Sequence, residues 1–288
     1  MSNLGMLAMF ARELIARSHQ PRGQSPSAQL GSQGIITAME DGGVVNGRTA
    51  AGYLYHSARI TQTIVGSKFC VDLGCGTGVQ LLQVAALNPT TQFIGIDREP
   101  AIVNAGAARA AELSLTNVEW IVADLTNPLK VEREIDAAIS TMCLHDLPDP
   151  AALDALLANM REMVGPQGAI YIEDFARLRC RRSIDFFVGL NAPVPPDEFA
   201  ALYRCSLNAA FSLHELKAAC AKLPAARLYS TFLVPFLVVV KTADRPLSLD
   251  TRAKFHAMRE NLVAHYRRDL DDLRRFFALG GLRNDPFA

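Results

Sequence analysis

The most constraining feature of the sequence is a glycine-rich turn between an apolar run and a helical pattern. Positions 71–80 read VDLGCGTGVQ, so that glycines stand at Gly74, Gly76 and Gly78. Glycine permits a tight turn and close backbone approach, and a helix beginning at Val79 would offer free N–H groups to a polar or negatively charged ligand. The turn therefore predicts either a nucleotide-type binding loop or a purely structural strand-to-helix connection.

The surrounding pattern is typical of a parallel α/β sheet, because short apolar runs alternate with helical segments from Lys68 onward. Strands are expected near 69–73, 92–96, 118–122, 135–140 and 168–173, and helices near 78–87, 100–113 and 151–163. The stretch 226–242 predicts two further strands, joined near Pro235 as an antiparallel pair. Ligands of such folds bind at the carboxyl ends of the strands.

Helical segments are expected before this α/β region. Apolar residues three and four positions apart predict an N-terminal amphipathic helix that packs on the protein. These residues are Leu4, Leu7, Ala8, Ala11, Leu14 and Ile15. A linker or mobile loop is expected at 21–34, followed by a mainly helical stretch at 35–65 with an interruption at 41–43.

Helices also follow the α/β region. Ser212 and Glu215 have the spacing of a capping box and predict a helix start, and the apolar spacing from Phe255 to Phe277 predicts one terminal helix. We therefore divide the chain into three parts. They are an N-terminal helical region or lid at 1–66, a binding domain at 67–245 with a helical insertion around 177–221, and a C-terminal helix at 246–288.

Two aspartates narrow the choice of ligand for the glycine turn. Asp97 ends the second expected strand, where its carboxylate can accept both hydroxyls of an adenosine ribose. Asp124 and Leu125 end the third, where a carboxylate and a backbone amide can meet an adenine edge. The G-x-G-x-G spacing differs from the G-x-G-x-x-G of dinucleotide enzymes, which argues against a dehydrogenase.

Together, the segments VDLGCGTGVQ, GIDREP, VADLTNP and AAISTMCLHDLPDP resemble successive motifs of the class I S-adenosylmethionine (SAM)-dependent methyltransferases over roughly residues 68–175. The resemblance implies an α/β, Rossmann-like, doubly wound sheet of seven strands with an antiparallel last strand. It also implies SAM as the cofactor and a small-molecule metabolite as the methyl acceptor.

The resemblance further implies roles for individual residues. It puts the three glycines of the turn against the methionine part of SAM, with Asp72 orienting the amino group, Asp97 holding the ribose and Asp124 reading the adenine. The full set expected to bind the cofactor is Asp72, Gly74, Cys75, Gly76, Gly78, Asp97, Arg98, Asp124, Leu125 and Ser140.

Three residues are candidates for catalysis. His145 is followed by Asp146, as in the His-Asp pair of many small-molecule members of the family, and it is either a proton acceptor or a loop-packing histidine. Tyr53 is a candidate for a lid over SAM, together with Tyr55. Glu173 follows the fifth strand, where it could receive a cationic or amine acceptor.

The segment after the fifth strand offers further acceptor-binding groups. Arginines could receive a carboxylate or phosphate, or could simply form surface ion pairs with Glu173 and Asp174. They are Arg177, Arg179, Arg181 and Arg182. Aromatic residues could line an apolar acceptor pocket or form a helical core stripe. They are Phe186, Phe187, Phe199 and Tyr203.

Two alternatives to methyl transfer stay open. An enzyme of this fold can cyclise SAM to azetidine-2-carboxylate and release methylthioadenosine, and a silent module can bind a partner through its added helices. The absence of a D/N/S-P-P-Y/F/W sequence after the fourth strand argues against methylation of exocyclic base nitrogens, and the absence of a Pro-Cys pair argues against covalent attack on cytosine.

Composition argues against other classes of partner. The 29 basic residues balance 29 acidic ones, which disfavours nucleic acid as a substrate. Six cysteines without a CxxC pair indicate a reduced, cytoplasmic protein, and no histidine cluster has metal-ligand spacing. The longest uncharged apolar run, 231–240, is too short to span a membrane. The terminal helix could serve a symmetric homodimer.

Overall fold

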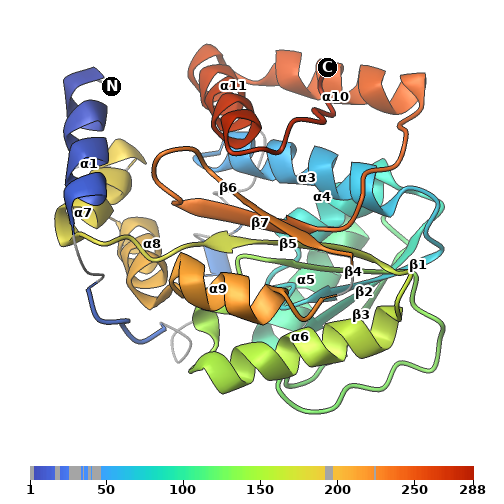
Figure 1. Cartoon of the computed structure of the whole chain (residues 1–288). Coiled ribbons are helices and arrows are strands. Elements are labelled where there is room, and N and C mark those ends of the chain that lie inside the picture. Colours follow the sequence, from blue (N-terminus) through green and yellow to red (C-terminus); the bar gives the residue numbers. More distant parts are fainter. Residues whose placement is uncertain are drawn as a thin grey trace.

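The computed structural model describes residues 3–16, 20–25, 34, 36–37, 40, 47–191, 197–223 and 225–288. Figure 1 shows one twisted sheet covered by helices on both faces. The strands are β1 (Phe69–Leu73), β2 (Gln92–Asp97), β3 (Val118–Val122), β4 (Ala137–Thr141), β5 (Ala169–Phe175), β6 (Arg227–Ser230) and β7 (Leu237–Lys241). Their order is β3-β2-β1-β4-β5-β7-β6.

The pairing of the strands confirms the expected fold class. The five strands from β1 to β5 pair in parallel, and β7 lies antiparallel to both β5 and β6. Helices α4 (Val79–Leu87), α5 (Pro100–Glu112) and α6 (Pro150–Val164) follow β1, β2 and β4. The order of the parallel strands reverses between β1 and β4, so a binding crevice is expected at their carboxyl ends.

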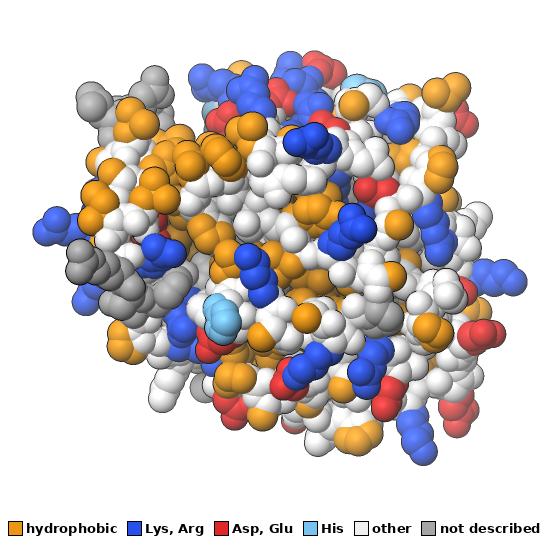
Figure 2. Space-filling view, in the orientation of Figure 1, with side chains coloured by type: hydrophobic (Ala, Val, Ile, Leu, Met, Phe, Trp, Pro, Cys, Tyr) orange, Lys and Arg blue, Asp and Glu red, His pale blue; other side chains and the backbone are white. Residues whose placement is uncertain are grey.

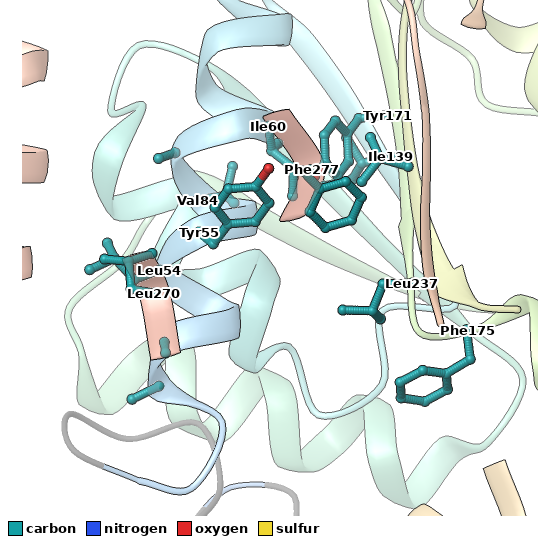
Figure 3. Close-up of a cluster of buried hydrophobic side chains, with 14 of the residues drawn as sticks. Leu54, Tyr55, Ile60, Val84, Ile139, Tyr171, Phe175, Leu237, Leu270 and Phe277 are labelled. Atoms are coloured by element: carbon teal, nitrogen blue, oxygen red, sulfur yellow. The ribbon is translucent and has the colours of Figure 1, made fainter. Parts of the chain in front are cut away.

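Successive side chains of β5 point to opposite faces of the sheet and pack into two separate hydrophobic cores. Tyr171 packs with α3 (Ala50–Ile64) and α11 (Ala264–Leu279) on one face, whereas Ile170 and Ile172 pack with α6 on the other. Figure 3 shows the first core, in which Tyr55 of α3, Phe277 of α11 and Tyr171 of the sheet meet.

A third group of helices stands at the carboxyl end of the sheet. It comprises α1 (Asn3–Ile15), α7 (Arg181–Asn191) and α8 (Glu198–Ala209), which Figure 1 shows together on the left. Helix α1 contacts α7, and α8 contacts the short helix η2 (Leu144–Asp146) that follows β4. Helix α9 (Leu213–Cys220) begins at the predicted capping box, in which Ser212 and Glu215 bond each other's backbone N–H groups.

The predicted orientation of the first helix is wrong. Leu7, Leu14 and Ile15 are exposed, whereas Met9 and Glu13 are buried. Figure 2 shows hydrophobic side chains gathered on the surface at the upper left, where Figure 1 has α1. The reason is a capping interaction across the chain, because the Glu13 carboxylate accepts hydrogen bonds from the backbone N–H groups of Arg179 (2.9 Å) and Cys180 (3.0 Å). These donors precede α7, so Glu13 turns inward.

The C-terminal helical region is confirmed, but it forms two helices rather than one. Helix α10 (Leu249–Asn261) ends before α11 begins at Ala264. Arg267 donates to the backbone oxygens of Glu260 and Leu262, and Arg259 lies 2.8 Å from Asp271. These contacts join residues that a single straight helix would hold far apart.

Two expectations near the N-terminus lie partly or wholly outside the described residues. Of the expected linker, residues 21–25 have no regular structure and Gly34 is helical, and the interruption expected at 41–43 is not described. None of the described helices is both long and apolar enough to cross a membrane.

Candidate active site

The glycine turn adopts a backbone that only glycine takes without strain. Gly74, Gly76 and Gly78 have φ values of 80°, 55° and 75°, in the left-handed region. A Cβ atom on Gly78 would clash with the ring of Trp120, and one on Gly74 would clash with the side chain of Cys143. The turn is therefore tightly packed by these side chains, and α4 begins directly after it.

Two aspartates lie around this turn. Asp97 accepts hydrogen bonds from the backbone N–H groups of Gly76 and Glu99, each at 3.1 Å, while burial raises its pKa. Asp72 is fully buried, and its two carboxylate oxygens accept no hydrogen bond from any described residue. Burial and the nearby Asp97 raise the pKa of Asp72 to about 8. An unpartnered buried carboxylate of this kind fits a cationic group.

A cavity of about 630 Å³ lies in front of the turn, at the carboxyl ends of the strands. Most of the predicted cofactor and catalytic residues line it. They are Gly74, Cys75, Gly76, Asp97, Arg98, Asp124, Leu125, Tyr53, His145 and Glu173. These residues come from the carboxyl ends of all five parallel strands and from α3.

Other predicted site residues lie away from the cavity surface. Asp72 and Gly78 are buried and do not line the cavity, and Ser140 is fully buried with its hydroxyl donating to the backbone oxygen of Leu73 (2.7 Å). Ser140 therefore ties β4 to β1, and the prediction that it contacts the cofactor is not supported. Tyr55 does not form a lid, because it is fully buried and stacks on Phe277.

The part of the cavity away from the turn is aromatic. The ring of Phe175 lies 5.5 Å from those of His145 and Tyr203 and 5.6 Å from that of Phe236, which in turn stacks on Phe187 at 3.9 Å. All four aromatic residues proposed from the sequence as pocket residues line this wall. Phe175 and Phe236 were missed, since a strand end and a proline-containing turn carry no periodic signal.

The four arginines proposed to bind an anionic acceptor do not line the cavity. Arg177 lies 3.1 Å from Glu215, and Arg179 donates to the backbone oxygens of Glu13 and Ala16. Neither of them lines the cavity, and neither do Arg181 and Arg182. We call the aromatic part of the cavity, away from the glycine turn, the aromatic lobe. Among the described residues that line this lobe, one is an arginine, Arg48, which pairs with Asp197.

One buried histidine–carboxylate pair joins η2 to β5. Nδ1 of His145 lies 2.7 Å from Oδ1 of Asp174, whose other oxygen accepts the backbone N–H of His145 (3.1 Å). Nε2 of His145 faces Asp146 at 3.8 Å. Burial lowers the pKa of His145, but the two carboxylates outweigh burial and raise this pKa to about 9. The two carboxylates therefore favour the cationic form of His145 near neutral pH.

A second buried pair joins α3 to β5. Nε2 of His56 lies 3.0 Å from Oε1 of Glu173, without the alignment of a hydrogen bond, and Nδ1 lies 2.7 Å from the hydroxyl of Tyr171. Burial, aided by the Arg59 guanidinium, lowers the pKa of His56 to about 3. Burial and Asp174 raise the pKa of Glu173 well above its usual range. The role of Tyr171 was not predicted from the sequence.

Comparison with known proteins gives these features a context. A family model described as a methyltransferase domain matches residues 66–210, just over half of the chain. A tRNA (guanine-N(7)-)-methyltransferase of Rubrobacter xylanophilus is 32% identical over 80 residues, which cover 28% of this chain and 34% of that protein. Nocamycin O-methyltransferase of Saccharothrix syringae is 30% identical over 127 residues, which cover 44% of this chain and 38% of that protein.

These matches span little more than a third of the length of the curated relatives. Among solved structures, the plantazolicin methyltransferase BpumL in complex with SAH (S-adenosylhomocysteine) superposes with a TM-score of 0.54 at 15% identity, covering 93% of this chain and 94% of that one. At this level of identity the similarity supports the fold.

Proposed function

Because the chain belongs to the SAM-dependent methyltransferases of the class I fold, we propose that it transfers the methyl group of SAM to a small, largely apolar molecule. One observation carries the proposal: a single cavity has the glycine turn and Asp97 at one end and an aromatic wall at the other. The first end suits an adenosine and a methionine group. The second suits an apolar acceptor next to them.

The residues around the turn suit SAM in detail. We propose that the Asp97 carboxylate accepts the ribose hydroxyls, that the rim residues Asp124 and Leu125 meet the adenine, and that the unpartnered Asp72 lies beneath the ammonium group. Asp124 accepts two hydrogen bonds from Thr126, which lower its pKa and keep it charged. SAM supplies a methyl group on a sulfonium, which is already a strong electrophile. The chain then needs to align the acceptor and to exclude water.

A small acceptor is favoured over a nucleic acid by charge. The chain has no net charge, and Arg48 in the aromatic lobe is already paired with Asp197, so the lobe offers little to a phosphate backbone. Because relatives of this chain include tRNA methyltransferases, RNA is the alternative acceptor that an experiment must include.

The proposal is tested by incubating the chain with SAM alone, with SAM and 2-naphthol, and with SAM and a tRNA transcript, and by following the products by mass spectrometry. We expect SAH and a methylated naphthol. Methylthioadenosine formed without an acceptor would instead indicate cyclisation of SAM, and SAH formed only with tRNA would indicate an RNA substrate.

Cofactor binding is tested separately by calorimetry with SAH. Replacing Asp97 by Ala is expected to weaken binding by about 1–3 kcal/mol, because ribose hydroxyls lose a charged acceptor. The matched control is Asp154→Ala, which removes an exposed carboxylate of α6 that pairs with Lys222 away from the cavity. No binding of SAH by the unaltered chain would leave only the non-catalytic module.

A further inference from the structure

Two consecutive residues of β5 carry carboxylates to opposite faces of the sheet. Glu173 lies on the face of Tyr171 and α3, and Asp174 lies on the face of Ile172 and α6. Thr141 of β4 pairs in register with Glu173, so the backbone of Glu173 lies two strand spacings, roughly 10 Å, from β1, which the glycine turn follows. Glu173 therefore borders the part of the cavity where an acceptor would lie beside the cofactor.

His145 is a poor candidate for accepting a proton. Its Nδ1 is hydrogen-bonded to Asp174 at 2.7 Å, and its Nε2 faces Asp146 at 3.8 Å, beyond hydrogen-bond distance but near enough for the two carboxylates to favour a protonated ring. Its backbone oxygen accepts a hydrogen bond from Arg22, which also holds the backbone oxygen of Pro148. A general base needs an unprotonated nitrogen within reach of the substrate, and this arrangement favours the doubly protonated ring instead.

Glu173 has the opposite setting. One oxygen, Oε1, faces Nε2 of His56, while the other accepts no hydrogen bond from the described residues, and the carboxyl group borders the cavity. If Nε2 of His56 carries the ring proton, Nδ1 is free to accept the hydroxyl proton of Tyr171. Tyr171, His56 and Glu173 then form one chain of polar contacts that ends at the cavity.

We propose that Glu173 accepts the proton of an acceptor hydroxyl during methyl transfer, and that His56 and Tyr171 are positioning residues that hold its carboxylate. This inference rests on the proposed function and names the acceptor as a hydroxyl compound. The acceptor oxygen forms a bond to the methyl carbon, the carbon–sulfur bond breaks with its electron pair remaining on sulfur, and the hydroxyl proton moves to Glu173. His145 remains a paired cation throughout.

The surroundings of the Glu173 carboxylate suit a proton acceptor. Burial and the neighbouring Asp174 raise the pKa of Glu173, which makes its carboxylate a stronger base. Tyr53 stands one helical turn before His56 on α3 and also lines the cavity, so it closes the same side of the acceptor position.

The test compares two phenols at about pH 8, where 2-naphthol is largely un-ionised and 4-nitrophenol is largely ionised. Replacing Glu173 by Gln is expected to lower kcat for 2-naphthol by about 100-fold and to change kcat for 4-nitrophenol by less than about 3-fold. The second substrate needs no base, so it also reports that the variant is folded. Equal losses with both phenols would overturn the assignment.

The positioning residues are tested with Tyr171→Phe, which removes one hydroxyl. We expect kcat for 2-naphthol to fall by about 5-fold with KM unchanged, because the carboxylate is held less firmly. The matched control is Tyr55→Phe, another fully buried tyrosine, whose hydroxyl has no hydrogen-bond partner among the described residues and does not reach the cavity. Equal effects of the two substitutions would overturn the role of Tyr171.

Nitrogen NMR of ¹⁵N-histidine-labelled chain decides the matter without an acceptor. We expect His145 to be doubly protonated near neutral pH and His56 to be neutral with its proton on Nε2. A neutral His145 with a free Nε2, or a charged His56, would overturn the inference. If neither phenol is methylated by the unaltered chain, the proposed acceptor class fails, whereas the spectra still decide the proton positions.

Discussion

The two histidine–carboxylate pairs at the end of β5 use carboxyl groups that are adjacent in sequence, but their histidine rings differ in charge. His145 faces two carboxylates, which raise its pKa to about 9, whereas His56 faces one carboxyl group and lies near the Arg59 guanidinium, and its pKa falls to about 3. Both rings are buried, so burial alone does not decide the protonation state. What differs is the number and the alignment of the charges that meet each ring.

The largest expected effect comes from breaking the charged pair. Asp174→Asn should lower the free energy of unfolding by about 4 kcal/mol, because it removes the partner of a buried imidazolium. Glu173→Gln is the matched variant one residue earlier, and it should be close to neutral in stability since Glu173 has no hydrogen-bonded cationic partner to lose among the described residues. Urea unfolding near neutral pH measures both, and similar losses would mean that the two pairs do not differ in charge.

The fold itself was largely readable because its signals are local. The glycine turn, the strand alternation and the capping box at Ser212 each depend on neighbours in the sequence, and the structure has them where they were expected. The break between α10 and α11 was not predicted, because the contact of Arg259 with Asp271 exists only after the chain has turned.

The site was readable only in part, for a related reason. A strand period of two indicates that Glu173 and Asp174 point to opposite faces, but not which histidine meets each of them. Those partners depend on the rotation of α3 and on the path of η2, which tertiary packing sets. The hydroxyl of Ser140 could likewise contact the cofactor or bond a neighbouring strand. The register of β4 beside β1, which the sequence does not reveal, places it against the backbone oxygen of Leu73.

The charged pair also predicts how stability depends on pH on the alkaline side. The pKa of His145 rises from 6.5 to about 9 on folding, so its contribution is fully present below pH 6.5 and is lost as pH rises through about 9. The loss amounts to about 3 kcal/mol over that window. Unfolding of His145→Gln should show a flatter pH dependence between these limits, and an unchanged slope would contradict the raised pKa.

The neutral pair predicts the opposite behaviour on the acid side. The pKa of His56 falls from 6.5 to about 3, so the unfolded chain binds the extra proton first and stability declines as pH falls below 6.5. Between pH 6.5 and about pH 5 the difference between the unaltered chain and His56→Gln should change by about 2 kcal/mol. Constant differences over this range would show that His56 is already charged in the folded chain.

The smallest effect concerns the hydroxyl that anchors the neutral pair. Tyr171→Phe leaves Nδ1 of His56 without its 2.7 Å partner in a fully buried setting, so the free energy of unfolding should fall by about 1 kcal/mol. Tyr55→Phe loses no hydrogen bond to a described residue and should change it by less than about 0.5 kcal/mol. Because the charged pair contains no tyrosine, the pKa of His145 should stay unchanged in Tyr171→Phe. A shift of that pKa in histidine NMR would mean that the two pairs on opposite faces of β5 titrate together rather than separately.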